Sequence, residues 1–199
     1  MFNRRKLFTP GMTVGLFGGS FDPPHKGHSL VSAKLKAALS LDVVWWLVAP
    51  QNPLKTRSPD SMENRLNACR ELVGSFNNRV YISDEETRLG TRNTVDTVRK
   101  LKQIYPQVKF IWLMGADNMA SLHHWKDWQV LMHDIPMAIY PRSGYVVKAG
   151  LSPAAQQFGN YRIASDQAAN LKTIDAPAWV LLTGKMDDIS STTLRNKTS

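Results

Sequence analysis

The sequence predicts an α/β fold, namely a Rossmann-like, doubly wound parallel sheet of five or six strands with helices on both faces. Short apolar runs alternate with longer stretches in which apolar residues recur at helical spacing. Alternation of this kind pairs strands in parallel through right-handed crossovers. No repeat, low-complexity segment or linker divides the 199 residues, so we expect a single domain over 1–199, with a basic N-terminal arm at 1–12.

Six runs are expected to form strands, because each is short, apolar and rich in β-branched or aromatic residues. In chain order they cover residues 13–17, 43–49, 79–83, 108–114, 137–140 and 178–183. A polar loop is expected after the third run. Residues 143–177 show the weakest periodicity, which predicts a loop with a short helix near 153–158.

Three longer helices are expected between the strands, and each has one apolar face. These faces are Val31, Leu35, Ala38 and Leu39; Met62, Leu66, Cys69 and Val73; and Val95, Val98, Leu101 and Tyr105. Thr94 is the predicted N-cap of the third helix. One or two short helices should follow within 125–132, and Ser190 should begin a last one. Four tryptophans lie in strand runs and are expected in the core: Trp45, Trp46, Trp112 and Trp179.

The chain is strongly basic, with 25 Lys and Arg against 16 Asp and Glu and a formal charge of +9. This excess favours an anionic partner, either nucleic acid or a smaller molecule that carries phosphates. No run approaches the roughly 20 apolar residues of a membrane-spanning helix. Gly18 and Gly19 interrupt the apolar run that a signal peptide would need. The single cysteine, Cys69, rules out a disulfide framework. We therefore expect a cytoplasmic protein.

The first candidate site follows the first predicted strand and reads GGSFDPPHKGH. Ligands of an open parallel sheet bind outside the carboxyl ends of its strands. Gly18 and Gly19 allow a phosphate to approach the backbone closely. His25 and His28 lie at a predicted helix start, where free N–H groups and the helix dipole attract anions. Capping or zinc binding would also use two histidines, but no further Cys or His cluster accompanies them.

This segment resembles the GGxFxPxHxGH signature of the HxGH nucleotidyltransferases, relatives of class I aminoacyl-tRNA synthetases. Residues 189–195, ISSTTLR, resemble the second signature, ISSTxxR. Five further features stand in the order and spacing of the nicotinate mononucleotide adenylyltransferases: PQNPLK at 50–55, TVDT at 94–97, Gly115-Ala116-Asp117, Trp125, and PRSGY at 141–145. The resemblance extends from about residue 13 to residue 195.

The resemblance implies transfer of AMP from ATP to nicotinate mononucleotide, which gives nicotinate adenine dinucleotide and pyrophosphate in NAD biosynthesis. The implied catalytic residues are His25, His28 and Arg195. The implied ATP-binding residues are Gly18, Gly19, Ser20, Phe21, His25, Gly27, His28, Gly115, Asp117, Ile189, Ser190, Ser191, Thr192 and Arg195. The implied residues for the mononucleotide are Ser20, Phe21, Lys55, Thr94, Trp125 and Arg142. Mg²⁺ is expected through the ATP phosphates with no protein ligand, and a homo-oligomer is compatible with the family.

Several of these positions have a second interpretation. Asp117 fits a ribose contact, orientation of a histidine, or capping of the following helix. Lys55 fits a substrate phosphate or solvent, and Thr94 fits both a cap and the nicotinate end. Trp125 offers a flat ring that suits stacking on a pyridine. Arg142 follows the fifth predicted strand, where it could contact a phosphate or a carboxylate.

Three alternatives to this function remain open. Nicotinamide mononucleotide is one alternative acceptor, because the choice between carboxylate and amide depends on a fitted donor that the sequence does not show. Another phosphate-bearing acceptor of the same superfamily is disfavoured by ISSTTLR and by the length of the chain. A basic nucleic-acid-binding protein is disfavoured because Lys and Arg are spread along the chain and no motif for reading RNA or DNA is present.

Overall fold

The computed structural model describes residues 7–50, 60–74 and 79–183. Lys55 and the predicted second signature, 189–195, lie outside the described residues, and so does the helix expected from Ser190. Within the described part of the chain, no helix has both the length and the apolar character needed to cross a membrane.

The described residues form one parallel sheet of seven strands. The strands are β1 (Thr13–Gly19), β2 (Val43–Val48), β3 (Val80–Ser83), β4 (Lys109–Gly115), β5 (Met137–Tyr140), β6 (Arg162–Ile163) and β7 (Trp179–Leu181). The predicted α/β class with parallel pairing is confirmed, and six strands match the six predicted runs. The expected count of five or six is wrong, because β6 adds an edge strand. With two residues, β6 is too short to show any periodicity in the sequence.

The helices alternate with these strands. They are α1 (Lys26–Ala38), α2 (Met62–Gly74), α3 (Glu85–Leu89), α4 (Thr94–Ile104), α5 (Ala116–Ser121), α6 (Trp128–Asp134), α7 (Val146–Gly150) and α8 (Pro153–Gln157). Short 3₁₀ helices add η2 (Leu122–His124), η3 (Gly159–Tyr161) and η4 (Ser165–Lys172).

Three local predictions are corrected. The polar loop expected after β3 contains α3. The segment 143–177 contains α7, α8, η3, β6 and η4, rather than a loop with a single short helix. Asn93, not Thr94, is the N-cap of α4; its backbone is extended at φ −123°, and Thr94 is the first residue of the helix.

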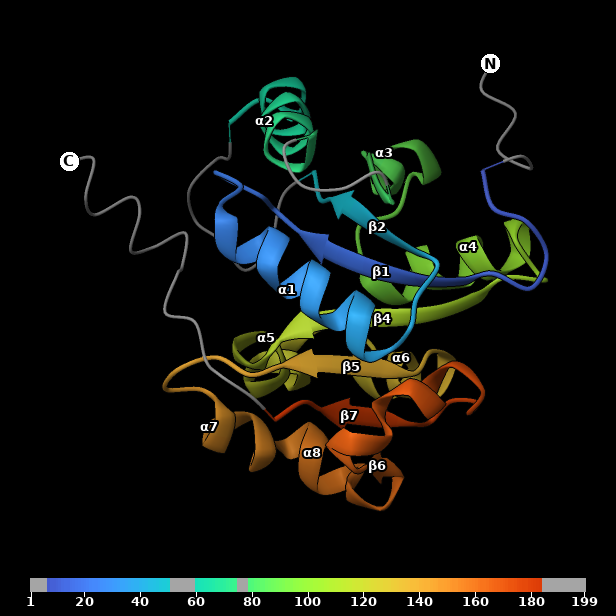
Figure 1. The fold of residues 1–199 in the computed structure, drawn as a ribbon, viewed down its shortest axis with the longest axis vertical. Coiled ribbons are helices and arrows are strands. Elements are labelled where there is room, and N and C mark those ends of the chain that lie inside the picture. The colour runs from blue at the N-terminus through green and yellow to red at the C-terminus, as the bar shows by residue number, and fades with distance from the viewer. Residues whose placement is uncertain (1–6, 51–59, 75–78, 184–199) are drawn as a thin grey trace.

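Helices cover both faces of the sheet, as the doubly wound class requires. Figure 1 shows α1 in front of the sheet and α4 and α6 behind it. The predicted apolar faces of α1 and α2 pack on one side of the sheet, and that of α4 packs on the other. The four strand tryptophans are at most 2% exposed, which confirms them as core residues.

The strand order places the topological switch point at the centre of the sheet. The order is β3-β2-β1-β4-β5-β7-β6, so the chain moves outward from β1 to β3 and then returns to β4 on the other side of β1. The connections leave β1 and β4 over opposite faces, which opens a crevice outside the carboxyl ends of these two strands. This crevice is the expected ligand position.

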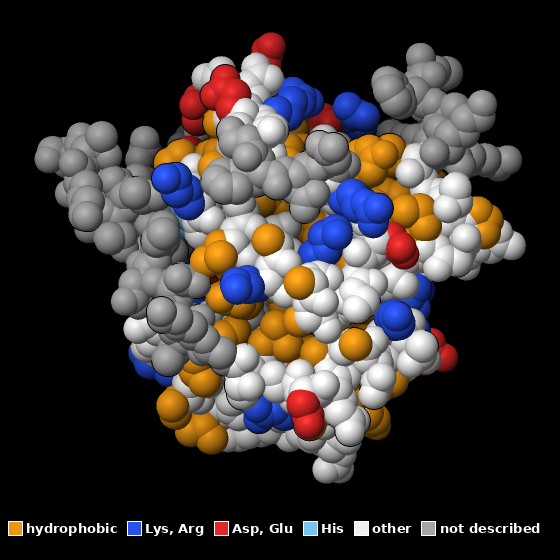
Figure 2. Space-filling model, viewed as in Figure 1, with side chains coloured by type: hydrophobic (Ala, Val, Ile, Leu, Met, Phe, Trp, Pro, Cys, Tyr) orange, Lys and Arg blue, Asp and Glu red, His pale blue; other side chains and the backbone are white. Residues whose placement is uncertain are grey.

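Basic side chains are dispersed over the face that carries α1. Figure 2 shows Lys and Arg separated there by apolar and neutral groups, while acidic side chains gather over α2. On this face, the described residues therefore present no continuous basic band.

Candidate functional site

The carboxyl end of β1 and the turn that follows it are packed against aromatic rings. A Cβ added to Gly18 would lie 2.6 Å from Cη2 of Trp112, and one added to Gly19 would lie 3.2 Å from the Phe21 ring. Phe21 itself has a left-handed backbone with φ 45°, which is costly for a residue with a side chain. The glycines are therefore needed for packing as well as for the approach of a ligand to the backbone.

The structure brings His25 and His28, hereafter the histidine pair, into contact at the start of α1. Their ring centroids lie 3.8 Å apart, and the planes are inclined by 32°. The backbone N–H of His25, the N-cap, donates to Nδ1 of His28 at 3.2 Å. Because Nδ1 accepts this bond, Nε2 carries the hydrogen in the neutral form of His28.

A chain of aromatic contacts links the histidine pair to the core of the protein. The Phe21 ring lies 4.9 Å from the His28 ring and stacks on Trp46 at 4.8 Å with an 8° angle between the planes. Trp46 donates from Nε1 to Oγ of Ser32 at 3.0 Å, inside the core. The orientation of His28 therefore depends on β2 and on the middle of α1.

The carboxyl ends of β4 and β5 carry an ion pair. Nη1 of Arg142 lies 2.5 Å from Oδ2 of Asp117, and both side chains are about 30% exposed. Asp117 does not cap α5, whose N-cap is Gly115. A Cβ at Gly115 would lie 2.5 Å from Oδ1 of Asp117, so this glycine leaves room for the carboxylate. The pairing of these two residues was not foreseen from the sequence.

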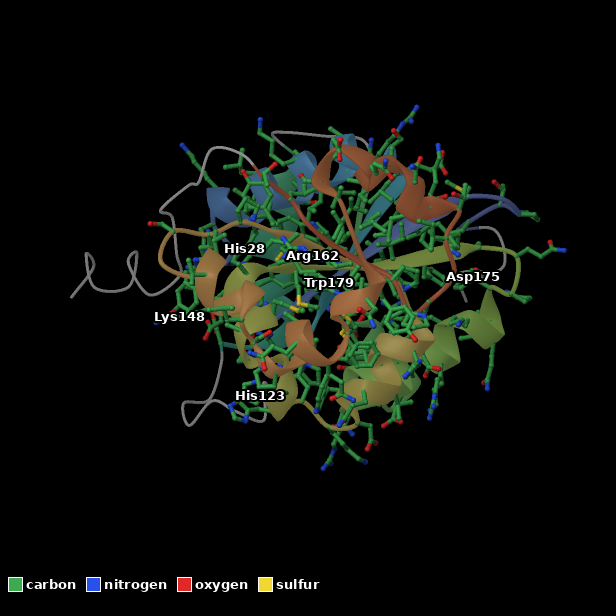
Figure 3. The ribbon with its side chains drawn as sticks, turned by 90° about the horizontal axis from the view of Figure 1, so that it is seen from below. His28, His123, Lys148, Arg162, Asp175 and Trp179 are labelled. Atoms are coloured by element: carbon green, nitrogen blue, oxygen red, sulfur yellow. The ribbon has the colours of Figure 1, made fainter. Side chains whose placement is uncertain are left out.

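Further positive charge lies beyond β5. Two basic groups lie over the ring of Tyr145. Cζ of Arg142 is 6.0 Å from the ring centroid, and Nζ of Lys148 is 5.5 Å from it. Figure 3 shows His28 and Lys148 toward the same end of the molecule and Asp175 at the opposite end. Basic groups therefore accompany the histidine pair at the carboxyl end of the sheet.

Trp125 is linked to the carboxyl end of β1 through Trp112. The two indole rings are perpendicular, with centroids 6.3 Å apart and an 87° interplanar angle, and the Trp112 ring also borders Gly18. Trp125 is half-buried. Thr94 is also half-buried and begins a helix that runs back from β3 to the start of β4, which places it at the carboxyl edge of the sheet.

One buried residue is absent from the residues expected from the sequence. Arg65, in α2, is 2% exposed, and its guanidinium binds the carbonyl oxygens of Ser20 and Ala49, each at 2.7 Å. Burial lowers the pKa of this guanidinium below its ordinary value. The available signal was its position four residues before Cys69, on the buried face of α2.

The described residues contain no group of three or more His, Cys, Asp or Glu side chains that could hold a metal ion. Mg²⁺ is an oxygen-seeking ion that is commonly bound through substrate phosphates and water. The donors described at this edge include imidazole and guanidinium groups and the Asp117 carboxylate, which is paired with Arg142, and this set is compatible with a metal bound through substrate phosphates.

Two glycines at the end of β1 and paired histidines at the switch point of a parallel sheet define a Rossmann-like protein with a candidate nucleotide site. The chain belongs to the cytidylyltransferase-like family, whose model matches residues 16–197. The resemblance inferred from the two signatures is thereby confirmed at the level of the family.

Curated relatives are similar over nearly the whole chain. A protein of Ruegeria pomeroyi, named probable nicotinate-nucleotide adenylyltransferase, is 46% identical over 186 residues, which cover 94% of this chain and 86% of the relative. A protein of the same name from Parvibaculum lavamentivorans is 45% identical over 195 residues, covering 98% of this chain and 96% of the relative.

Solved structures support the fold. The nicotinic acid mononucleotide adenylyltransferase of Plasmodium falciparum, complexed with APC, superposes with a TM-score of 0.68 at 18% identity, covering 93% of this chain and 83% of the other. The same enzyme complexed with NaAD gives a TM-score of 0.68 at 17% identity with the same coverage.

Proposed function

We propose that this protein transfers the AMP moiety of ATP to nicotinate mononucleotide, forming nicotinate adenine dinucleotide and pyrophosphate in NAD biosynthesis. The observation that carries the proposal is the histidine pair at the start of α1, beside the two glycines that end β1 and at the switch point of the sheet. Relatives of 45–46% identity that carry the adenylyltransferase name support it. We place this activity in one nucleotidyltransferase domain over 1–199, in the cytoplasm.

The reaction requires little covalent chemistry from the protein. An oxygen of the mononucleotide phosphate attacks the α-phosphorus of ATP in line, and the bond from that phosphorus to the β-phosphate oxygen breaks. Both substrates and the leaving pyrophosphate are anions, so the protein contributes by aligning them and by neutralising charge in the transition state.

The histidine pair is proposed to neutralise the phosphates of ATP. Nε2–H of His28 is a donor whose direction is set by the bond from the His25 backbone to Nδ1. The backbone N–H groups at the start of α1 are further donors, and the positive end of the helix dipole points to the same place. Because these groups are already oriented, they need no rearrangement as charge develops.

The ATP site is proposed to extend along the turn and across to β4. Its described members are Gly18, Gly19, Ser20, Phe21, Gly27, Gly115 and Asp117, with the histidine pair. The second signature, with Ile189, Ser190, Ser191, Thr192 and Arg195, is proposed to supply hydroxyl and guanidinium donors to the leaving pyrophosphate. Mg²⁺, bound through the ATP phosphates, would supply additional charge neutralisation.

The acceptor is proposed to bind on the β4 and β5 side, together with Ser20 and Phe21. Arg142 pairs with Asp117 through Nη1, and its other guanidinium nitrogens are proposed to donate to an anionic group of the mononucleotide. Trp125 offers a half-buried ring, held perpendicular to Trp112, for stacking on the pyridine. Thr94 and Lys55 are proposed as further contacts of the acceptor.

The decisive experiment is a pyrophosphate-release assay with ATP and Mg²⁺ that compares nicotinate and nicotinamide mononucleotides as acceptors. We expect release with both substrates present, a higher kcat/KM for the nicotinate form, and loss of release when EDTA removes the metal. Equal or reversed preference would overturn the choice of acceptor, and release with neither acceptor would overturn the activity.

A further inference from the structure

We propose that Arg65 is a positioning residue, which holds the turn after β1 and the end of β2 in the register that the histidine pair requires. The described contacts of Arg65 carry the proposal. The effect of Arg65 on catalysis rests on the proposed adenylyl transfer, whereas the effect of Arg65 on the backbone does not.

The buried guanidinium uses its donors mainly on backbone carbonyl oxygens. Nη1 donates to Ser20 O and to Ala49 O, both at 2.7 Å, and Nη2 donates to Pro50 O at 3.1 Å. Nε donates to Asp60 O at 3.0 Å, and Nη2 also approaches the Met62 sulfur at 3.8 Å. An arginine side chain has five N–H donors in a planar fork, and this arrangement occupies all of them.

The acceptors belong to segments that are far apart in the sequence. Ser20 lies in the turn after β1, Ala49 and Pro50 follow β2, and Asp60 precedes α2. The bond from Arg65 to Ser20 joins residues 45 positions apart. A backbone bond from Ala49 N to Gly19 O, at 2.9 Å, lies beside this contact. One side chain therefore sets the spacing between the ends of two neighbouring strands.

The position of this turn is transmitted to the histidine pair. Ser20 precedes Phe21, whose ring contacts His28 at 4.9 Å and stacks on Trp46. If the Ser20 carbonyl moves, the left-handed Phe21 and its ring move with it, and His28 loses its support. Displacements of about 1 Å around reacting groups can cost about 100-fold in rate.

The chemistry of the contact favours positioning over simple stabilisation. A buried charge is costly to desolvate, and an apolar side chain of similar volume is often as stable in its place. A planar fork can hold several carbonyl oxygens at fixed angles, whereas a lysine ammonium is a point charge on a flexible stem. Arg65 covers the oxygens of Ser20 and Ala49, so these partial negative charges are neutralised where anionic substrates are proposed to bind.

The test compares Arg65→Lys and Arg65→Met with a matched control, Arg70→Lys. Arg70 lies in the same helix, is exposed, and bonds to the side chain of Asn67 at 2.9 Å. We expect Arg65→Lys to lower kcat at least tenfold in folded protein, whereas Arg70→Lys stays within twofold of wild type. Unchanged kcat in folded Arg65→Lys, with only a lower Tm, would show a merely structural role and overturn the proposal.

Amide hydrogen exchange gives a readout that needs no activity. In Arg65→Lys, the amides of residues 19–21 and 49 should exchange at least tenfold faster than in wild type, while those of β4 stay unchanged. The proposal would be overturned if these amides exchanged at the wild-type rate, or if exchange rose equally in β4. If Arg65→Lys does not fold, kcat and amide exchange are measured on Arg65→Met instead, because methionine removes the buried charge and fills the space. A wild-type protein without adenylyl transfer would refute the proposed function, and exchange would still decide the role of Arg65.

Discussion

The histidine pair owes its geometry to aromatic side chains that pack against it. His28 rests on the Phe21 ring, Phe21 stacks on Trp46, and Trp46 is anchored to Ser32 in α1. On the other side of the switch point, Trp112 similarly borders Gly18 and Trp125. The polar groups of the site are therefore presented by an aromatic layer that belongs to the core.

Replacing His28 with alanine should abolish most turnover without unfolding the protein. The half-buried ring leaves little cavity, while removal of one oriented donor from a phosphate site typically costs 10²–10³ in rate. We expect pyrophosphate release to fall about 100-fold, with a Tm close to that of wild type. His133→Ala, an exposed histidine in α6, is the control and should keep wild-type turnover. Near-normal turnover in folded His28→Ala would contradict the role given to His28.

Gly115→Ala tests the ion pair at the ends of β4 and β5. The new Cβ would lie 2.5 Å from Oδ1 of Asp117, so the carboxylate must turn away and its bond with Arg142 is strained or lost. Because a side-chain end can move, we expect a loss of stability of only about 1 kcal/mol but an increase in KM for the mononucleotide of about tenfold.

The control for this variant is Gly74→Ala, at the end of α2, where a Cβ meets no atom within 4 Å. Steady-state kinetics and urea denaturation of both variants provide the measurements. An unchanged KM for the mononucleotide in Gly115→Ala would show that the ion pair of Asp117 and Arg142 does not contribute to acceptor binding.

Among the secondary-structure elements, α3 and the turn into α4 best show how packing orders a polar segment. Gly90 ends α3 in a left-handed conformation at φ 63°, which a residue without a side chain adopts readily. The hydroxyls of Thr91 and Thr97 lie 2.7 Å apart in the interior and tie this turn to the first turns of α4. The same contact fixes where α4 begins, and with it the position of Thr94.

Glu86 should make stability depend on pH. Burial raises the pKa of this α3 carboxyl from 4.5 to about 7. Between these values the folded protein binds a proton that the unfolded chain releases, so stability is highest below pH 4.5 and falls as pH rises toward 7. Between pH 5 and pH 8, the free energy of unfolding should fall by about 2 kcal/mol more in wild type than in Glu86→Gln.

Urea denaturation at both pH values measures this difference. Glu63→Gln, which changes an exposed carboxyl in α2, should keep the wild-type dependence. Identical pH dependence in Glu86→Gln and wild type would show that Glu86 does not titrate in this range.

At the level of the whole molecule, the strand order concentrates the candidate groups at one edge. The turn after β1, the start of α1, Asp117 and Arg142 all follow strands that end at the carboxyl side of the sheet. By contrast, basic side chains are dispersed over the face shown in Figure 2. On that face, this distribution favours small anions bound at the edge of the sheet over a nucleic-acid polymer.

Ligand-dependent melting distinguishes these two partners. ATP with Mg²⁺ at 100 times its Kd should stabilise the folded protein by about 2.7 kcal/mol, seen as a higher Tm. Duplex DNA and single-stranded RNA should give no gel shift near physiological salt. A gel shift that weakens steeply with salt, together with a Tm unaffected by ATP, would instead support nucleic-acid binding.

The sequence predicted those parts of the fold that depend on local periodicity. Six strands, the buried faces of α1, α2 and α4, and the position of GGSFDPPHKGH between a strand and a helix all follow from apolar spacing over fewer than about 15 residues. Segments without such a signal differ from the prediction. β6 has only two residues, and α3 contains two buried glutamates in a polar sequence that is typical of a solvent-exposed loop.

The α/β class, the order of most elements, and the segment with two histidines that carries the family resemblance are all readable in the sequence. Three contacts become visible only in the folded chain: Asp117 with Arg142, Trp112 with both Trp125 and the end of β1, and Arg65 with Ser20. These contacts escape the sequence because their partners are far apart along the chain. These contacts join residues 25 and 45 positions apart for the two arginines, and local spacing carries no information about such neighbours until the sheet brings them to one edge.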